Sequence, residues 1–276
     1  MISLDEIQQV AGEANADIAV IEKDYVLSWV LKGIFESSVA DSLVFKGGTA
    51  LRKVYFKDYR FSEDLDFTIS KPVEPADFQS SLADVCRDVR SQSGLEMNLI
   101  GLRQTRSETG QEAFEGKIEY IGPRQHRGSP SRIKLDLTAH EQIILPPVTF
   151  PLIHGYSDQC QAKISTYQLE EILAEKMRTI IQRSYPRDLY DSWYILKFHQ
   201  DRIDFSKLIS TYRKKCEFKN IRPVDWKAFF QTPAILNKEA AFSNSLGRQL
   251  KDLPGFAELT NELTKLLTDL GSKTKS

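Results

Sequence analysis

Two short stretches decide the fold of this sequence: FKGGTAL at residues 45–51 and FSEDLDF at residues 61–67. The first predicts the end of a buried strand, interrupted by Gly47 and Gly48 and followed by a short helix. The second leads into a strand whose apolar and polar side chains alternate. A glycine pair lets the backbone turn sharply and approach a ligand, and amides at the start of a helix suit a phosphate.

The polar side chains of that second strand are carboxylates. Asp64 and Asp66 are two positions apart, so both point to the same side of the strand. Such a pair repels unless a cation lies between its members, and hard oxygen ligands suit Mg²⁺ held together with a triphosphate. Asp136, in an expected strand over residues 133–138, is the third carboxylate that would complete a site for two Mg²⁺ (or Mn²⁺) ions.

Each of these signals has a plainer explanation when taken alone. An Asp-x-Asp pair on a strand is more often solvated or engaged in ion pairs, and a glycine pair is more often just a turn. Asp136 has a nearby competitor in Glu141. The order of glycine pair, helix and carboxylate strand nevertheless favours a metal-assisted phosphate chemistry.

Basic residues gather around these stretches although the net charge of the 276-residue chain is only −1. Lys46 and Arg52 precede the carboxylate pair, in a cluster that suits a triphosphate and an RNA backbone. Lys176 lies on an expected helix over residues 168–183, where its charge suits the developing charge of a triphosphate. An ordinary amphipathic helix with solvated charges is the alternative for Lys176.

Composition favours a globular protein of the cytoplasm. Hydrophobic residues make up 41% of the chain, and the three cysteines are too widely spaced for a zinc site or a disulfide framework. The N-terminus lacks the pattern of a secretory signal, and no apolar stretch is long enough to span a membrane. Helical spacing dominates from about residue 168, which predicts an α+β domain over residues 1–160 and a helical domain over residues 161–276.

The motifs FKGGTALRKVY, RFSEDLDFTI, IKLDL and LEEILAEKMRTIIQRSYPRDLYDSWYIL together resemble those of the AbiEii/AbiGii toxin family. The resemblance implies a polymerase-β-like nucleotidyltransferase palm with a mixed sheet, followed by a helical domain that completes the active-site cleft. It implies nucleotide binding by Gly47, Gly48 and Thr49, and metal binding by Asp64 and Asp66. It also marks Ser62 as a recurring serine and assigns supporting catalytic roles to Lys176, Asp188 and Asp191.

The resemblance also implies what the protein acts on. The family is similar to MenT-type toxins, which transfer nucleotides to the 3′ end of tRNA, and its members often accompany an antitoxin. We therefore expect an NTP substrate, an RNA acceptor such as tRNA, a cognate antitoxin and no membrane partner. Two alternatives stay open: a non-catalytic protein that senses nucleotide or binds a partner, and nucleotidyl transfer to a protein or small molecule.

Overall fold

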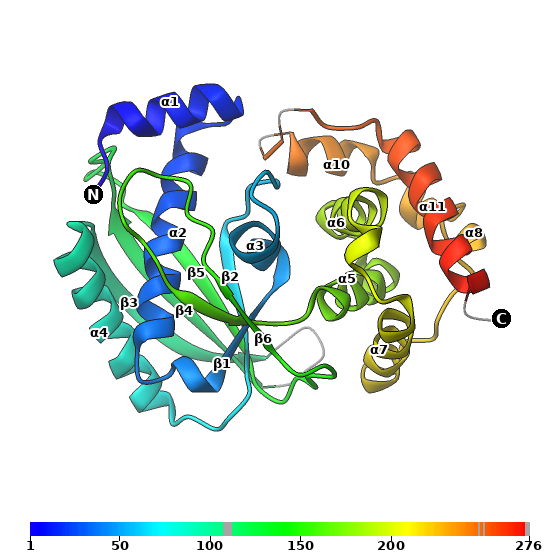
Figure 1. The fold of residues 1–276 in the computed structure, drawn as a ribbon, viewed down its shortest axis with the longest axis horizontal. Coiled ribbons are helices and arrows are strands. Elements are labelled where there is room, and N and C mark those ends of the chain that lie inside the picture. The colour runs from blue at the N-terminus through cyan, green and yellow to red at the C-terminus, as the bar shows by residue number, and fades with distance from the viewer. Residues whose placement is uncertain (107–111, 248, 251, 274–276) are drawn as a thin grey trace. The chain divides into compact units, whose positions relative to one another are not determined.

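The computed structural model describes residues 1–106, 112–247, 249–250 and 252–273. The chain divides into two compact units (Figure 1). Unit 1 comprises residues 1–143 and 147–167, and unit 2 comprises residues 144–146 and 168–276.

Unit 1 is organised by a sheet that, within the described residues, has seven strands in the order β3-β4-β5-β2-β1-β7-β6 (Figure 1). The sheet is mixed, because β2 runs antiparallel to β1 and parallel to β5. The strands are β1 (Leu43–Lys46), β2 (Asp64–Ile69), β3 (Glu96–Arg106), β4 (Glu112–Ile121), β5 (Ser131–Thr138), β6 (Val148–Pro151) and β7 (Lys163–Thr166).

The alternation of β5 shows why these residues form a sheet with two different faces. Ile133, Leu135 and Leu137 are at most 1% exposed, and each contributes ~1.5–3 kcal/mol by burial. Lys134 and Asp136 lie between them in the sequence and therefore point to the opposite face. The polar side chains of the strand thus occupy the face that the core leaves free.

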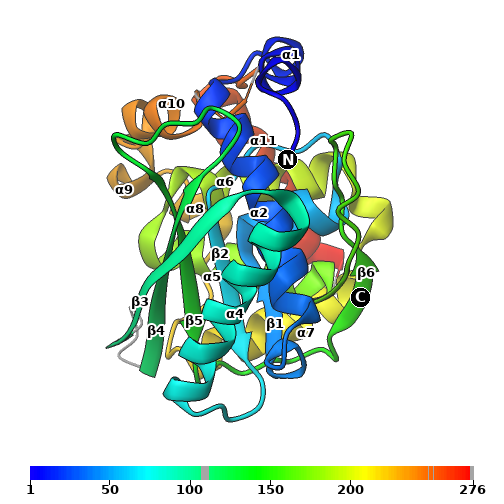
Figure 2. The same cartoon turned by 90° about the vertical axis from the view of Figure 1, so that its left-hand side faces the viewer.

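Helices cover the apolar face of the sheet. α1 (Leu4–Ala14) is capped by Ser3, whose hydroxyl accepts a hydrogen bond from the amide of Glu6 at 3.2 Å. α2 (Ile18–Glu36) is buried on most sides, and α4 (Pro75–Ser93) packs against it. Figure 2 shows both helices lying across the same face of the sheet. The short α3 (Gly47–Ala50) continues into a π-helical turn, Leu51–Tyr55.

The sequence pattern did not predict the two short strands β6 and β7. β6 and β7 have four residues each, too few for an alternation to stand out, and they exist because β7 pairs with β1 and β6 with β7. This pairing keeps the chain in unit 1 as far as Tyr167, beyond the boundary after residue 160 that the sequence predicted.

Unit 2 is helical. Its helices are α5 (Leu169–Arg183), α6 (Pro186–Phe198), α7 (Phe205–Phe218), α8 (Trp226–Phe229), α9 (Pro233–Leu236), α10 (Glu239–Leu246) and α11 (Phe256–Lys273). The buried carboxylate of Glu171 pairs with Lys215 at 2.8 Å and accepts the amides of Ile144 and Leu145, each at 2.8 Å. These bonds explain why residues 144–146 belong to this unit.

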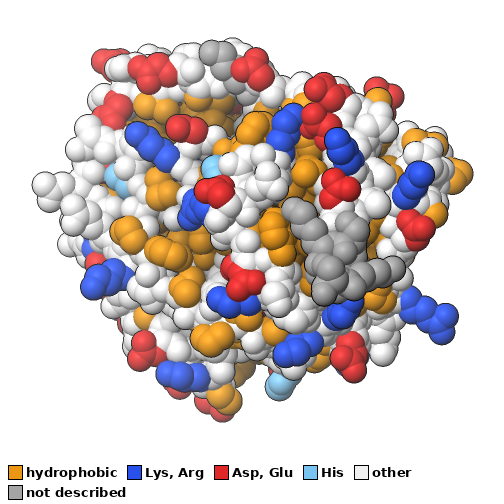
Figure 3. Space-filling model, turned by 45° about the vertical axis from the view of Figure 1, so that its right-hand side comes forward, with side chains coloured by type: hydrophobic (Ala, Val, Ile, Leu, Met, Phe, Trp, Pro, Cys, Tyr) orange, Lys and Arg blue, Asp and Glu red, His pale blue; other side chains and the backbone are white. Residues whose placement is uncertain are grey.

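The predicted fold class is confirmed: a mixed sheet with helices is followed by a helical part, an α+β arrangement. Among the described helices, none combines the length and apolar character needed to cross a membrane. Figure 3 shows acidic and basic side chains interspersed over the visible face, in keeping with the near-neutral net charge. Any contact with a polyanion therefore has to come from a local cluster.

Candidate functional site

The glycine pair forms the turn from β1 into α3, and a side chain would be strained at Gly47 and closely crowded at Gly48. Gly47 has a φ of 81°, in the left-handed region that other residues rarely adopt. A Cβ at Gly47 would overlap Oδ2 of Asp66, and a Cβ at Gly48 would lie 2.7 Å from Nη2 of the buried Arg60. The backbone of the turn is thus packed directly against the Asp66 carboxylate.

Two buried hydroxyls tie this turn to the start of β2. Oγ1 of Thr49 lies 2.8 Å from Oγ of Ser62 and donates to the carbonyl oxygen of Asp64 at 2.5 Å. Thr49 is 1% exposed and Ser62 is 8% exposed, so both side chains are buried beneath the turn. Their role in nucleotide binding stays a prediction.

Arg52, which the sequence suggested as a nucleotide ligand, belongs to an internal network. Its Nε donates to Oδ1 of Asp24 at 2.6 Å, and its guanidinium carbon lies 3.8 Å from the ring centre of Phe61. Lys53 pairs with the other oxygen of Asp24 at 2.8 Å. Burial alone would raise the pKa of Asp24, but the two cations outweigh it and hold that pKa well below its usual range. The network positions the segment that leads from Tyr59 into β2, since Arg52 also donates to the Tyr59 carbonyl.

Strand pairing brings the predicted metal carboxylates together. Asp136 on β5 lies opposite Asp66 on β2, and Lys46 on β1 lies opposite Asp66 on its other side. Asp64 is two residues before Asp66 and faces the same way. The three carboxylates therefore share one face of the sheet, next to the glycine turn.

The fit of this set to a metal depends on Lys134. Its Nζ lies 2.8 Å from Oδ2 of Asp136. Among the described residues, no three His, Cys, Asp or Glu side chains are grouped closely enough to hold a metal ion. The oxygen donors suit a hard cation such as Mg²⁺, and an ion held by Asp136 would lie close to the positive charge of Lys134 on the same carboxylate.

The helical residues predicted from the sequence meet within unit 2. Nζ of Lys176 on α5 lies 2.8 Å from Oδ1 of Asp188 and 2.9 Å from Oδ2 of Asp191, both on α6. Arg183 approaches the second oxygen of Asp188 at 3.2 Å. Burial alone would raise the pKa of Asp188, but Lys176 and Arg183 outweigh it and lower that pKa. Lys176, Asp188 and Asp191 thus form one buried ion-pair cluster.

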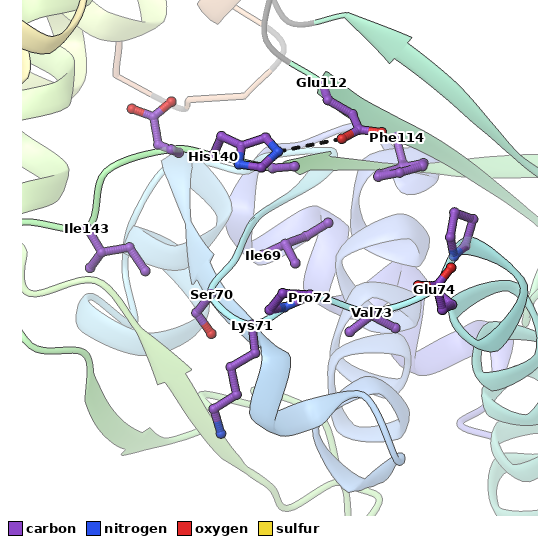
Figure 4. Close-up of a pocket in the computed structure, with 13 residues that line it drawn as sticks. Ile69, Ser70, Lys71, Pro72, Val73, Glu74, Glu112, Phe114, His140 and Ile143 are labelled. Carbon is purple, nitrogen blue, oxygen red and sulfur yellow. Dashed lines mark ion pairs between the residues drawn. The ribbon is translucent and has the colours of Figure 1, made fainter.

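A cavity of about 610 Å³ opens where β2 ends. Figure 4 shows Ile69, Pro72 and Phe114 on its walls, with His140 at 3.6 Å from Glu112 at its rim. The predicted site residues are not among those that line it. The cavity is therefore separate from the carboxylate site.

Three residues with evident roles in this geometry escaped the sequence-based assignment: Asp24, Arg60 and Lys134. Lys134 carried a usable signal, because residues two apart on a strand share a face and Asp136 follows it at that spacing. Arg60 belongs to the basic cluster that precedes Asp64, but nothing local in the sequence shows that Asp24 pairs with Arg52 or that Arg60 packs against Gly48.

Solved structures of similar fold come from two bacteria. MenT4, a nucleotidyltransferase toxin from Mycobacterium tuberculosis H37Rv, matches with a TM-score of 0.66 and 18% identity, over 98% of this chain and 90% of that one. JHP933 from Helicobacter pylori matches with a TM-score of 0.61 and 15% identity, over 94% of this chain and 95% of that one. At such identities these matches show the fold alone.

The family itself is shown by the sequence. Residues 29–262 match the family described as nucleotidyl transferase AbiEii toxin, type IV TA system. None of the curated proteins matches the chain. Nucleotidyltransferases take an NTP, generally with a divalent metal, and a toxin of this class implies a cognate antitoxin. The resemblance seen in the sequence motifs is confirmed, and the chain belongs to the AbiEii family of nucleotidyltransferase toxins of type IV toxin–antitoxin systems.

Proposed function

We propose that this protein transfers a nucleoside monophosphate from an NTP to the 3′-hydroxyl of an RNA, with tRNA as the acceptor. The hydroxyl oxygen forms a bond to the α-phosphorus, the bond from that phosphorus to the β-phosphate oxygen breaks, and pyrophosphate leaves. The hydroxyl proton passes to solvent or to a nearby carboxylate. The single observation that carries the proposal is the packing of the Gly47 turn against Asp66, with Asp136 opposite Asp66 on the next strand.

Each residue has a defined part in this reaction. Gly47 and Gly48 let the triphosphate approach the backbone, and Lys46 offers it a positive charge. Thr49, Ser62 and Arg52 fix the turn and its neighbouring segment from inside.

The metal carboxylates are Asp64, Asp66 and Asp136, which would hold two Mg²⁺ ions, with Mn²⁺ as a substitute. When bound, the ions neutralise the triphosphate and align the attacking and leaving oxygens. In this role the three aspartates determine where the α-phosphorus and the acceptor hydroxyl meet.

Lys176, Asp188 and Asp191 are proposed as supporting catalytic residues on the strength of the family resemblance. A lysine held by two carboxylates keeps a fixed orientation, which suits a group that stabilises charge on departing pyrophosphate. We also propose that the reaction takes place in the cytoplasm, where tRNA is found and where the free state of all three cysteines is expected.

Radiolabelled nucleotides test the proposal directly. The protein is incubated with α-³²P or γ-³²P NTP, Mg²⁺, and either purified tRNA, total RNA or total protein. Label from the α-phosphate should enter tRNA, and label from the γ-phosphate should not.

Asp66→Asn should abolish the transfer, and Asp88→Asn, at an exposed position of α4, should preserve it. Transfer of the γ label would instead make the protein a phosphotransferase. If only protein is labelled, the acceptor is a protein and not RNA. If the protein binds NTP but transfers no label, it is a nucleotide sensor.

A further inference from the structure

The face of the sheet that carries the aspartates continues into a cluster of cations. Glu115 on β4 has three cationic neighbours from three different strands. Nη2 of Arg103 on β3 and Nζ of Lys117 on β4 lie 3.0 and 3.1 Å from Oε1, and Nζ of Lys134 on β5 lies 3.5 Å from Oε2. Lys134 also pairs with Asp136 at 2.8 Å, so three cations face two carboxylates and the cluster keeps an excess of one positive charge.

The cluster stands in register with the carboxylate site. Arg103 lies opposite Glu115, Glu115 opposite Asp136, Asp136 opposite Asp66, and Asp66 opposite Lys46. Residues paired in this way point to the same face, so the five side chains form one row across five strands. At about 4.8 Å per strand, Glu115 lies roughly 10 Å from Asp66.

The order of this row separates two kinds of charge. The glycine turn and Lys46 lie at one end, the aspartates lie in the middle, and the cations around Glu115 lie at the other end. An in-line displacement needs the entering hydroxyl and the leaving phosphate on opposite sides of the phosphorus. With the NTP at the glycine turn, the acceptor strand arrives from the side of Glu115.

The cationic heads are available to a ligand. The side chains of Arg103, Lys117 and Lys134 are 70%, 45% and 41% exposed, whereas Glu115 is only 14% exposed. A lysine has three N–H donors and an arginine five, more than their contacts with Glu115 use, so donors remain for other acceptors. Burial alone would raise the pKa of Glu115, but the three cations lower it, so the carboxylate stays ionised and holds them in place.

Two other arginines of unit 1 are balanced one to one. Arg127 pairs with Glu96 at 2.5 Å, and Arg132 pairs with Glu119 at 3.2 Å. These two pairs leave no net charge. The excess of positive charge on the sheet face therefore centres on Glu115.

We propose that Arg103, Lys117 and Lys134, organised by Glu115, bind the phosphate backbone of the acceptor RNA within a few nucleotides of its 3′ end. The inference rests on the proposed function and adds the path of the acceptor to it. A strand that enters an acidic site meets repulsion from Asp64, Asp66 and Asp136, and the adjoining cations offset that repulsion. Contacts of this kind read the backbone and are independent of sequence.

Anisotropy of a short 5′-fluorescein-labelled single-stranded RNA, measured over a series of salt concentrations, tests the surface. Arg103→Ala with Lys117→Ala should weaken RNA binding about tenfold. The slope of log K against log salt concentration should fall in magnitude by about 1.4, because each lost phosphate contact contributes roughly 0.7. Binding of NTP should be unchanged. Arg103→Lys with Lys117→Arg retains both charges and should retain the affinity.

Arg87→Ala with Arg90→Ala is the matched control. It removes the same charge from exposed positions of α4, on the opposite face of the sheet, and should leave RNA binding unchanged. If Arg103→Ala/Lys117→Ala binds RNA as well as Arg87→Ala/Arg90→Ala does, the inference is wrong.

Failure of the inference and failure of the proposed function give different results. A wild type that transfers the α label to RNA, with no defect in Arg103→Ala/Lys117→Ala, retains the function and overturns the surface. A wild type that binds RNA through these cations but transfers no label retains the surface and overturns the function.

Discussion

Lys134 and Asp136 are two positions apart on β5, and Nζ of the lysine lies 2.8 Å from Oδ2 of the aspartate. The same Nζ is 3.5 Å from Glu115. Burial alone would lower the pKa of Lys134, but Asp136 and Glu115 raise it above its usual value, so the lysine is charged at neutral pH. Lys134 therefore places a positive charge between Glu115 and Asp136, the third of the proposed metal carboxylates.

Lys134→Met should strengthen metal binding. The variant removes a cation that competes for Asp136 and repels an incoming ion, and we expect an increase of about fivefold in Mn²⁺ affinity, equivalent to ~1 kcal/mol. Isothermal titration with Mn²⁺ measures it. Lys117→Met, which removes a lysine bound to Glu115 but not to Asp136, should change the affinity less. If Lys134→Met binds Mn²⁺ no more tightly than the wild type, Lys134 does not compete with the metal for Asp136.

Gly47→Ala should cost both stability and transfer activity. The φ of 81° disfavours alanine by ~1–2 kcal/mol, and the added Cβ displaces the Asp66 carboxylate. Gly94→Ala is the control, because Gly94 has a φ of 78° but its Cβ would meet only Met1 at 3.9 Å. Urea unfolding should show a loss in both variants, and the transfer assay a loss in Gly47→Ala alone. A fully active Gly47→Ala protein would show that the conformation of the Gly47 turn is not needed for nucleotidyl transfer.

Asp24→Asn should destabilise unit 1 by ~3–5 kcal/mol near pH 7, because it leaves Arg52 and Lys53 without their buried counter-charge. The folded-state pKa of Asp24 is lowered, so its contribution is present above the unfolded pKa of about 3.9 and is lost as pH falls towards the folded pKa. The difference between wild type and variant in urea unfolding should stay constant from about pH 8 to 5 and shrink below about pH 4. A difference that grows in acid would contradict this assignment.

Lys176 invites a comparison of two substitutions. Lys176→Met leaves Asp188 and Asp191, which are 2% and 0% exposed, without their shared cation and should destabilise unit 2 by ~3–5 kcal/mol. Lys176→Arg keeps the charge and should keep most of the stability. If Lys176 also stabilises the leaving group, Lys176→Arg should lower kcat for transfer while the KM for NTP changes little. An unchanged kcat would restrict Lys176 to a structural role.

Expression in cells tests the toxin assignment through the same aspartate. Wild-type protein produced without an antitoxin should slow growth, and Asp66→Ala at equal protein levels should not, because the growth defect depends on transfer. Growth curves with immunoblots to match the protein levels provide the measurement. Equal toxicity of the two proteins would point to aggregation or sequestration of a partner instead of catalysis.

Local patterns in the sequence determined the elements that carry the site. The two-residue period of residues 133–138 predicted β5, and Gly47 and Gly48 predicted the turn. These features depend on backbone geometry within a few residues, so the sequence is sufficient to reveal them. The family motifs likewise lie within continuous stretches, so the nucleotidyltransferase family could be recognised from the sequence alone.

Only the tertiary structure decided what these residues touch. Arg52 and Asp24 are 28 residues apart in the chain, and their pairing shows that Arg52 supports the segment beside the turn, while its role in nucleotide binding stays a prediction. The row from Arg103 through Glu115 and Asp136 to Asp66 depends on strand register. Register is fixed by pairing between distant segments, and a shift of one residue would turn each side chain to the other face.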